Sequence, residues 1–109
     1  MIFKTFLDRP VIKSTENNTV LSDRKVTAQL YCVAEGIPEV TFTWTFEGRV
    51  VYDSNPRTRN ETAKLDYVTY QDVLVIDDVG AKDFGHYICV ARNELGFETL
   101  QVALLPDGM

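Results

Sequence analysis

Few side chains in this 109-residue sequence are suited to catalysis. The single histidine, His86, could serve as a general base, but a nucleophile would have to lie beside it. Cys89 follows three positions later, and strand alternation places it on the opposite face. We therefore expect His86 to be a surface residue, with a pH-sensitive contact at an interface as the alternative. With no nucleophile–base pair and no phosphate-binding loop, we expect no enzymatic activity.

Metal binding has equally little support. Two cysteines and one histidine cannot complete a four-ligand zinc site without carboxylates, and no CxxC pair occurs. Asp77, Asp78 and Asp83 lie close together, but they do not follow the D-x-D-x-D-G spacing of a calcium loop. We expect no metal and no cofactor.

Composition and charge narrow the class of protein further. The formal net charge of −5 gives no general attraction for nucleic acid or for anionic membranes. Three arginines, Arg49, Arg57 and Arg59, could form a patch for an acidic partner, although a solvated face is the simpler interpretation. No window approaches the roughly 20 apolar residues that span a bilayer, and we do not expect the N-terminal residues to act as a signal peptide, since Lys4 and Asp8 interrupt their apolar run. If the protein acts outside the cell, we expect this chain to be part of a longer one.

The elements that must position these residues are strands. Apolar and polar residues alternate with period two in several segments separated by turns, and the clearest has Phe42, Trp44 and Phe46 on one face. We expect strands at residues 26–34, 40–46, 49–52, 62–66, 70–76, 86–92 and 97–105, and a polar loop at 53–60. Seven or more short strands in a chain of this length indicate an antiparallel sandwich or barrel.

Cysteine, tryptophan and tyrosine residues fall at a recognisable spacing on these strands. Trp44 follows Cys32 by 12 positions, and Tyr87 precedes Cys89 by two. This arrangement is the immunoglobulin signature. The run from Leu74 to Gly96 is also similar, without a gap, to the pattern L-x-I-x-x-V-x-x-x-D-x-G-x-Y-x-C-x-A-x-N-x-x-G. The chain therefore resembles an I-set domain of the immunoglobulin superfamily over nearly its whole length.

The resemblance implies an all-β, two-sheet antiparallel Greek-key sandwich, with strands A, B, E and D facing A′, G, F, C and C′. We expect the domain to cover residues 10–105, with a leading segment at 1–9 and the start of a linker at 106–109. The resemblance also implies a disulfide between Cys32 and Cys89. Closing so long a loop stabilises a fold by roughly 4 kcal/mol in the chain-entropy model. Two buried, reduced thiols are the alternative.

The family pattern assigns structural roles to its matched positions. In the family, the aspartate that corresponds to Asp83 accepts backbone donors or an arginine from the start of strand D, for which Arg57 and Arg59 are both candidates. Gly85 is expected to adopt a backbone shape that a Cβ would forbid. The expected core signature comprises Trp44, Leu74, Ile76, Asp83, Gly85 and Tyr87.

Partner binding is expected on a sheet face. Strand alternation points one set of side chains of strands C and F to solvent: Thr41, Thr43, Thr45, His86, Ile88 and Val90. Two apolar residues among threonines could form a small adhesive patch, and many family members bind through this face. A neighbouring domain covering the face is the simpler alternative, and Val73 and Val75 form a rival patch on the other sheet.

Two N-x-T sequons, at Asn17 and Asn60, are candidate N-glycosylation sites and favour a secretory route together with the disulfide. We therefore expect a non-catalytic protein-binding or spacer module of an extracellular adhesion molecule or receptor. It would make homophilic or heterophilic contacts with a protein partner and contacts with neighbouring domains, without nucleic acid and without inserting into the membrane. The alternative is a cytoplasmic structural module like those of giant muscle proteins, whose cysteines stay reduced.

Overall fold

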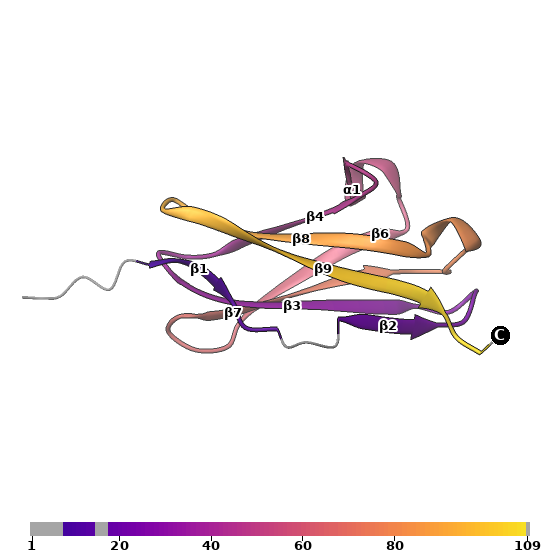
Figure 1. Ribbon diagram of the computed structural model, residues 1–109, viewed down its shortest axis with the longest axis horizontal. Coiled ribbons are helices and arrows are strands. Elements are labelled where there is room, and N and C mark those ends of the chain that lie inside the picture. Colours follow the sequence, from indigo (N-terminus) through magenta and orange to yellow (C-terminus); the bar gives the residue numbers. More distant parts are fainter. Residues whose placement is uncertain (1–7, 15–17, 109) are drawn as a thin grey trace, which may run out of the picture.

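The computed structural model describes residues 8–14 and 18–108, and these form a two-layer β-sandwich (Figure 1). One sheet has the strand order β1-β3-β7-β6, formed by Asp8–Ile12, Ala28–Ile37, Thr69–Ile76 and Thr58–Lys64. The other has the order β2-β9-β8-β4-β5, formed by Thr19–Ser22, Gly96–Pro106, Gly85–Asn93, Thr41–Phe46 and Arg49–Val50. A helical turn α1 (Val51–Ser54) and a 3-10 turn η1 (Ala81–Asp83) link the sheets. The predicted sandwich and its strand partition are confirmed.

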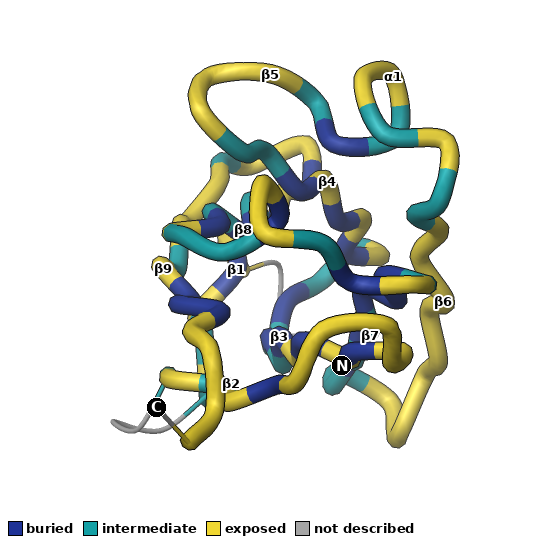
Figure 2. The backbone as a smooth tube through the Cα atoms, turned by 90° about the vertical axis from the view of Figure 1, so that its right-hand side faces the viewer, coloured by how far each residue is buried: buried dark blue, intermediate teal, exposed yellow. Residues whose placement is uncertain are grey.

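The core lies between the two sheets because every second side chain of the long strands points inward. In β3 the positions from Ala28 to Gly36 alternate between buried and more exposed, and Figure 2 shows buried positions gathered in the middle of the molecule. Leu30, Trp44 and Leu74 are fully enclosed. Burial of such a side chain contributes about 2 kcal/mol, so this layer supplies much of the stability.

A disulfide between Cys32 of β3 and Cys89 of β8 joins the two sheets through this core. The Cα atoms of the two cysteines are 6.5 Å apart, and neither residue is exposed. Trp44 pairs with Cys89 in the register of β4 and β8, so its indole packs in the same layer. The predicted disulfide is confirmed, and the alternative of two reduced thiols does not apply to this structure.

The alternation pattern predicted no strand before residue 26, whereas the resemblance implied strands A and A′. These are β1 (Asp8–Ile12), at the edge of one sheet, and β2 (Thr19–Ser22), at the edge of the other. β2 runs parallel to β9, whereas the remaining strand pairs of the described residues are antiparallel. Pro10 lies buried in β1, where the register shifts between Asp8 and Val11; proline cannot donate a ladder hydrogen bond and is tolerated at an edge.

Three local expectations were also wrong. The strand expected at 49–52 stops at Val50, and the chain then turns through α1. The loop expected at 53–60 ends earlier, since β6 begins at Thr58. Val26 does not belong to the core: β3 begins at Ala28, and Val26 is 43% exposed. The strands extend from Asp8 to Pro106, slightly beyond the expected boundaries of 10 and 105.

Candidate binding face

The outward side chains of β4, β8 and β9 form one continuous surface, here called the β4–β8–β9 face. The register places Thr43 opposite Val90 and Val90 opposite Thr99 in one row. The next row is Thr45, Ile88 and Gln101. The face comprises Thr41, Thr43 and Thr45 of β4, His86, Ile88, Val90 and Arg92 of β8, and Phe97, Thr99 and Gln101 of β9. The six candidate residues predicted from sequence therefore lie together on one surface.

The chemistry of this face is nearly uncharged. Among the described residues, its outward positions include no aspartate or glutamate, although acidic residues number 16 in the chain. Ile88 and Val90 are partly exposed at the centre. Val90 lies between two threonines, and Ile88 lies between Thr45 and Gln101. The centres of protein interfaces are depleted of charged residues, and an uncharged centre can be desolvated at low cost.

The two ends of the face carry its polar and aromatic groups. At one end, the Arg92 guanidinium lies 4.9 Å from the centre of the Phe97 ring, and Phe97 is 50% exposed. At the other end, the Gln101 amide nitrogen lies 3.2 Å from His86 Nδ1, and both residues are exposed. The sequence analysis did not include Phe97 among the candidate residues. The alternation pattern offered a signal, because Phe97 is out of phase with the inward residues Leu100 and Val102 and is therefore expected to point outward.

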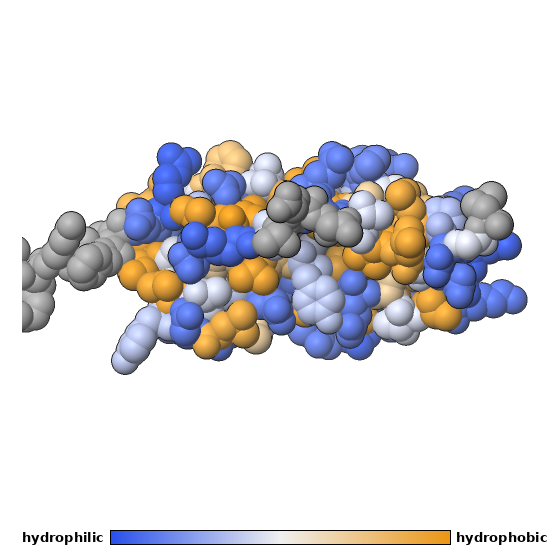
Figure 3. All heavy atoms as spheres, turned by 60° about the horizontal axis from the view of Figure 1, so that its bottom comes forward, coloured by the Kyte–Doolittle hydropathy of each residue, from blue (hydrophilic) through white to orange (hydrophobic). Residues whose placement is uncertain are grey.

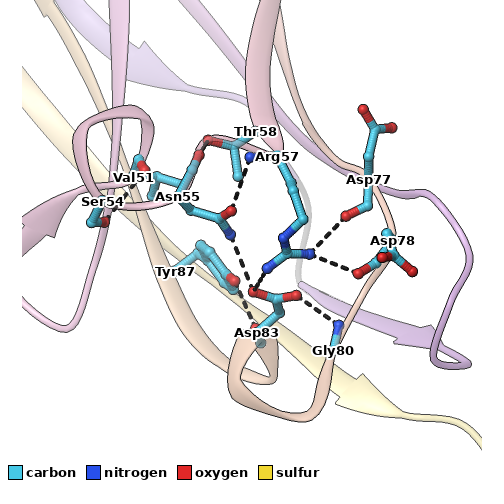
Figure 4. A network of polar contacts seen from close by, with 10 residues as sticks. All are labelled: Val51, Ser54, Asn55, Arg57, Thr58, Asp77, Asp78, Gly80, Asp83 and Tyr87. Atoms are coloured by element: carbon cyan, nitrogen blue, oxygen red, sulfur yellow. Dashed lines mark hydrogen bonds and ion pairs between the residues drawn. The ribbon is translucent and has the colours of Figure 1, made fainter.

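A polar network at one end of the sandwich fixes β8 beneath the face (Figure 4). The Tyr87 hydroxyl donates to the Asp83 carbonyl oxygen at 2.6 Å, which ties the start of β8 to η1. Burial is the main cause that raises the pKa of Tyr87. The ring of Tyr87 also stacks on Phe46, with centroids 4.3 Å apart. Because Tyr87 lies between His86 and Ile88, these contacts hold the outward side chains in place.

The Asp83 carboxylate is the centre of this network. It accepts from Arg57 Nη2 at 2.9 Å, from the Gly80 amide at 2.7 Å and from Asn55 Nδ2 at 3.1 Å. Arg57 is therefore the arginine that pairs with Asp83, whereas Arg59 pairs with Glu61 and Asp77. The hydrogen bond to Asp83 is the main cause that raises the pKa of Arg57.

Gly85 opens β8 in a conformation that requires glycine. Its φ is +148°, which side chains rarely adopt, and a Cβ there would lie 2.9 Å from the Phe46 ring. The other members of the expected core signature, Trp44, Leu74, Ile76, Asp83 and Tyr87, are all buried.

The outer face of the other sheet has a different character. Lys13 pairs with Glu35 there, and Arg59 joins Glu61 and Asp77. Figure 3, viewed from the side of β3 and β7 in Figure 1, shows hydrophobic and hydrophilic residues intermixed. The rival patch is corrected by the structure, since Val75 is only 1% exposed between Gln29 and Arg59 of the adjacent strands.

Other classes of site have no counterpart in the described residues. Residues 8–14 and 18–108 contain no group of three or more histidine, cysteine or acidic side chains placed to share a metal ion. The helices in this part of the chain are too short or too polar to cross a membrane. Of the two candidate glycan acceptors, Asn17 lies outside the described residues, and Asn60 lies on the exposed edge strand β6.

Known proteins resemble this chain in sequence over most of its length. A family model for the immunoglobulin domain matches residues 9–93. Mouse "Immunoglobulin superfamily member 10" is 33% identical over 95 residues, which cover 86% of this chain but only 3% of that protein. This chain thus corresponds to a small part of that relative.

Solved structures agree with this match. A chain from the complex of Dpr2 Ig1-Ig2 with DIP-Theta Ig1-Ig3 superposes with a TM-score of 0.80 and 28% identity, covering 90% of this chain and 32% of that one. Titin domain M7 superposes with a TM-score of 0.76 at 20% identity, covering 96% of this chain and 100% of that one, which shows the fold alone.

Proposed function

The chain belongs to the immunoglobulin domain family, and we propose that it is a non-catalytic module that binds a protein partner through the β4–β8–β9 face. The observation that carries this proposal is the uncharged centre of that face in an otherwise acidic chain. A partner surface of matching shape could cover Ile88 and Val90 without leaving a charge unpaired. The Dpr2–DIP-Theta structure supports a heterophilic contact, because it is a complex between immunoglobulin chains.

The parent protein is proposed to be an adhesion molecule or receptor outside the cell. A disulfide in the core favours an oxidising compartment. Mass spectrometry of the natively purified chain, before and after reduction, distinguishes this placement from a cytoplasmic structural module. A gain of two hydrogens on reduction supports the extracellular placement, and free thiols in the native chain would contradict it.

Neighbouring domains of the same parent are the second proposed class of partner. The end of the sandwich where β1 begins has a groove lined by residues that include Val11, Ile37 and Val68. Tyr67 beside it is 91% exposed. A preceding or adjacent domain packed there would cover these side chains, which fits a spacer role within a row of domains.

A matched pair of substitutions tests the binding face. Val90→Asp places a charge at the centre of the β4–β8–β9 face, and Val73→Asp places the same charge on the outward side of β7; both valines are partly exposed. The multimerised chain is assayed for aggregation of coated beads and for binding to an array of cell-surface immunoglobulin ectodomains. We expect Val90→Asp to weaken the observed binding at least tenfold and Val73→Asp to leave it unchanged. Equal effects of the two variants, or no binding by the unsubstituted chain, would refute the proposal.

A further inference from the structure

The sequon Asn60-Glu61-Thr62 occupies the middle of the edge strand β6. All three residues are exposed, and Figure 2 shows β6 as an exposed strand along one side. Asn60 pairs with Leu74 of β7, and Thr62 pairs with Asp72. Since Leu74 and Asp72 point into the sandwich, the side chains of Asn60 and Thr62 are also directed toward its interior.

Both sequon side chains bind one buried carboxylate. Asn60 Nδ2 lies 3.2 Å from Asp72 Oδ1 and 3.3 Å from Asp72 Oδ2, and the Thr62 hydroxyl also donates to Oδ1. Trp44 Nε1 donates to Oδ2 at 2.8 Å from the other sheet. Asp72 has no exposed surface, so it depends on these donors. Folding therefore commits the amide and the hydroxyl of the sequon to Asp72.

N-glycosylation needs the same two groups free. In the transfer, Asn60 Nδ2 forms a bond to C1 of a sugar, the bond from C1 to the pyrophosphate of a lipid-linked oligosaccharide breaks, and Nδ2 gives up one proton. The lipid pyrophosphate is the leaving group. The threonine two positions later is part of the recognised motif. In the folded chain, both side chains are exposed but their polar groups are hydrogen-bonded to Asp72, and the main chain is fixed against β7.

We propose that Asn60 is an N-glycan acceptor that is open only until β6 pairs with β7, so that folding closes the site. The inference rests on the proposed extracellular placement, because only a secreted chain meets the transfer enzyme. After transfer, Nδ2 keeps one hydrogen and can still donate to Asp72. β6 has no neighbour on its outer edge in the described sheet, so the glycan can project into solvent.

The test presents Asn60 to the enzyme in two folding states. The Asn17→Gln variant is used throughout, so that any added mass reports Asn60 alone. One sample is the oxidised, folded chain; the other is reduced and alkylated, and circular dichroism verifies that it is unfolded. Each is incubated with purified oligosaccharyltransferase and a lipid-linked oligosaccharide, and occupancy is read by mass spectrometry. Thr62→Ser retains the hydroxyl and the motif, and serves as the matched control.

We expect the unfolded chain to be modified at least ten times faster than the folded chain, with Thr62→Ser showing the same contrast. Equal rates in the two states would overturn the closure by folding, and no modification in either state would overturn the acceptor role. Binding by the unmodified chain is measured separately, so failure of the proposed function is distinguished from failure here.

A second measurement tests the retained contact. The glycosylated and unmodified chains are refolded and unfolded in urea, with Asn60→Ala for comparison. The proposal expects the glycosylated chain to keep the midpoint of the unmodified chain, and a midpoint as low as that of Asn60→Ala would overturn the retained hydrogen bond.

Discussion

Two carboxylates, Asp83 and Asp72, are buried in this sandwich and are held in different ways. Asp83 is 4% exposed and faces the guanidinium of Arg57, together with an amide of the main chain. Asp72 is 0% exposed and forms no ion pair among the described residues; its donors are neutral groups of Trp44, Asn60 and Thr62. The first charge is neutralised, whereas the second is only solvated by hydrogen bonds.

The difference has electrostatic consequences around Asp72. Burial raises the pKa of Asp72 above its ordinary value, and the three donors offset that effect only in part. Burial, together with the nearby Asp72 carboxylate, raises the pKa of Tyr52 to about 12. A buried charge with an ion-pair partner is costly to disrupt, whereas a buried charge without one lowers stability. Neutralising each carboxylate in turn should therefore change the free energy of unfolding by different amounts.

The largest effect is expected at Asp83. Asp83→Asn removes the ion pair with Arg57. It also replaces one carboxylate oxygen, which accepts hydrogen bonds from neighbouring donors, with an amide nitrogen that cannot accept them. We expect the free energy of unfolding to fall by about 3 kcal/mol. Urea unfolding followed by the fluorescence of the single tryptophan measures it. A loss below about 1 kcal/mol would show that the pair contributes little.

The arginine partner gives the next largest effect. Arg57→Gln loses the bonds to Asp83 and to the carbonyl oxygens of Asp77 and Asp78. Because the side chain is 38% exposed, we expect a loss of about 1.5 kcal/mol, smaller than that of Asp83→Asn. Arg59→Gln is the control; its ion pairs are exposed, and we expect no measurable change in the urea midpoint. Equal losses from the two variants would contradict the distinction.

Neutralising Asp72 should cost much less. The asparagine of Asp72→Asn retains one oxygen for Trp44 Nε1, can donate to the Thr62 oxygen, and removes a buried charge. We expect the free energy of unfolding at neutral pH to change by less than about 1 kcal/mol, in either direction. A loss as large as that from Asp83→Asn would mean that the charge of Asp72 stabilises the fold.

The smallest expected effect is a pH dependence of that same comparison. Because its pKa is raised, folded Asp72 retains a proton at pH values where the unfolded chain has released it. Its favourable contribution to the free energy of unfolding is therefore complete below the unfolded pKa. That contribution is lost as pH rises through the folded pKa. The unsubstituted chain should therefore lose stability relative to Asp72→Asn as pH rises from about 4 to neutrality. Urea midpoints of both proteins across this range measure the difference, and a constant difference would contradict the raised pKa.

The sequence predicts the sandwich well because long central strands alternate cleanly. Cys32, Trp44 and Cys89 then identify the layer through which the sheets are joined. The alternation pattern missed β1 and β2, which only the resemblance implied, because they are four or five residues long, lie at sheet edges and bury few side chains. A short edge strand is defined by the neighbour it pairs with, which its own residues do not encode.

The binding face and the buried network show the same limit. Alternation within β4 and β8 was enough to group their outward residues. Alternation also points Phe97 and Thr99 outward, but only the register of β9 beside β8 shows that they share this face. Asp72 sits on the inward phase of β7, between Tyr70 and Leu74. Hydrophobic patterning does not anticipate a buried carboxylate, because its donors come from other strands: Trp44 lies on β4 in the opposite sheet, and Asn60 and Thr62 lie on the preceding strand β6.

The disulfide between the sheets also sets how far the domain can be stretched. β1 begins near one end of the long axis and β9 ends near the other, so tension between these strands runs along the sandwich (Figure 1). The bridge spans 57 positions, which enclose β4 to β7. If the sheets were pulled apart, only the chain outside the loop closed by the disulfide could extend. The chain inside the loop, about 200 Å long when fully extended, could extend only after the bridge is reduced. The redox state would thereby control the length of the module under load.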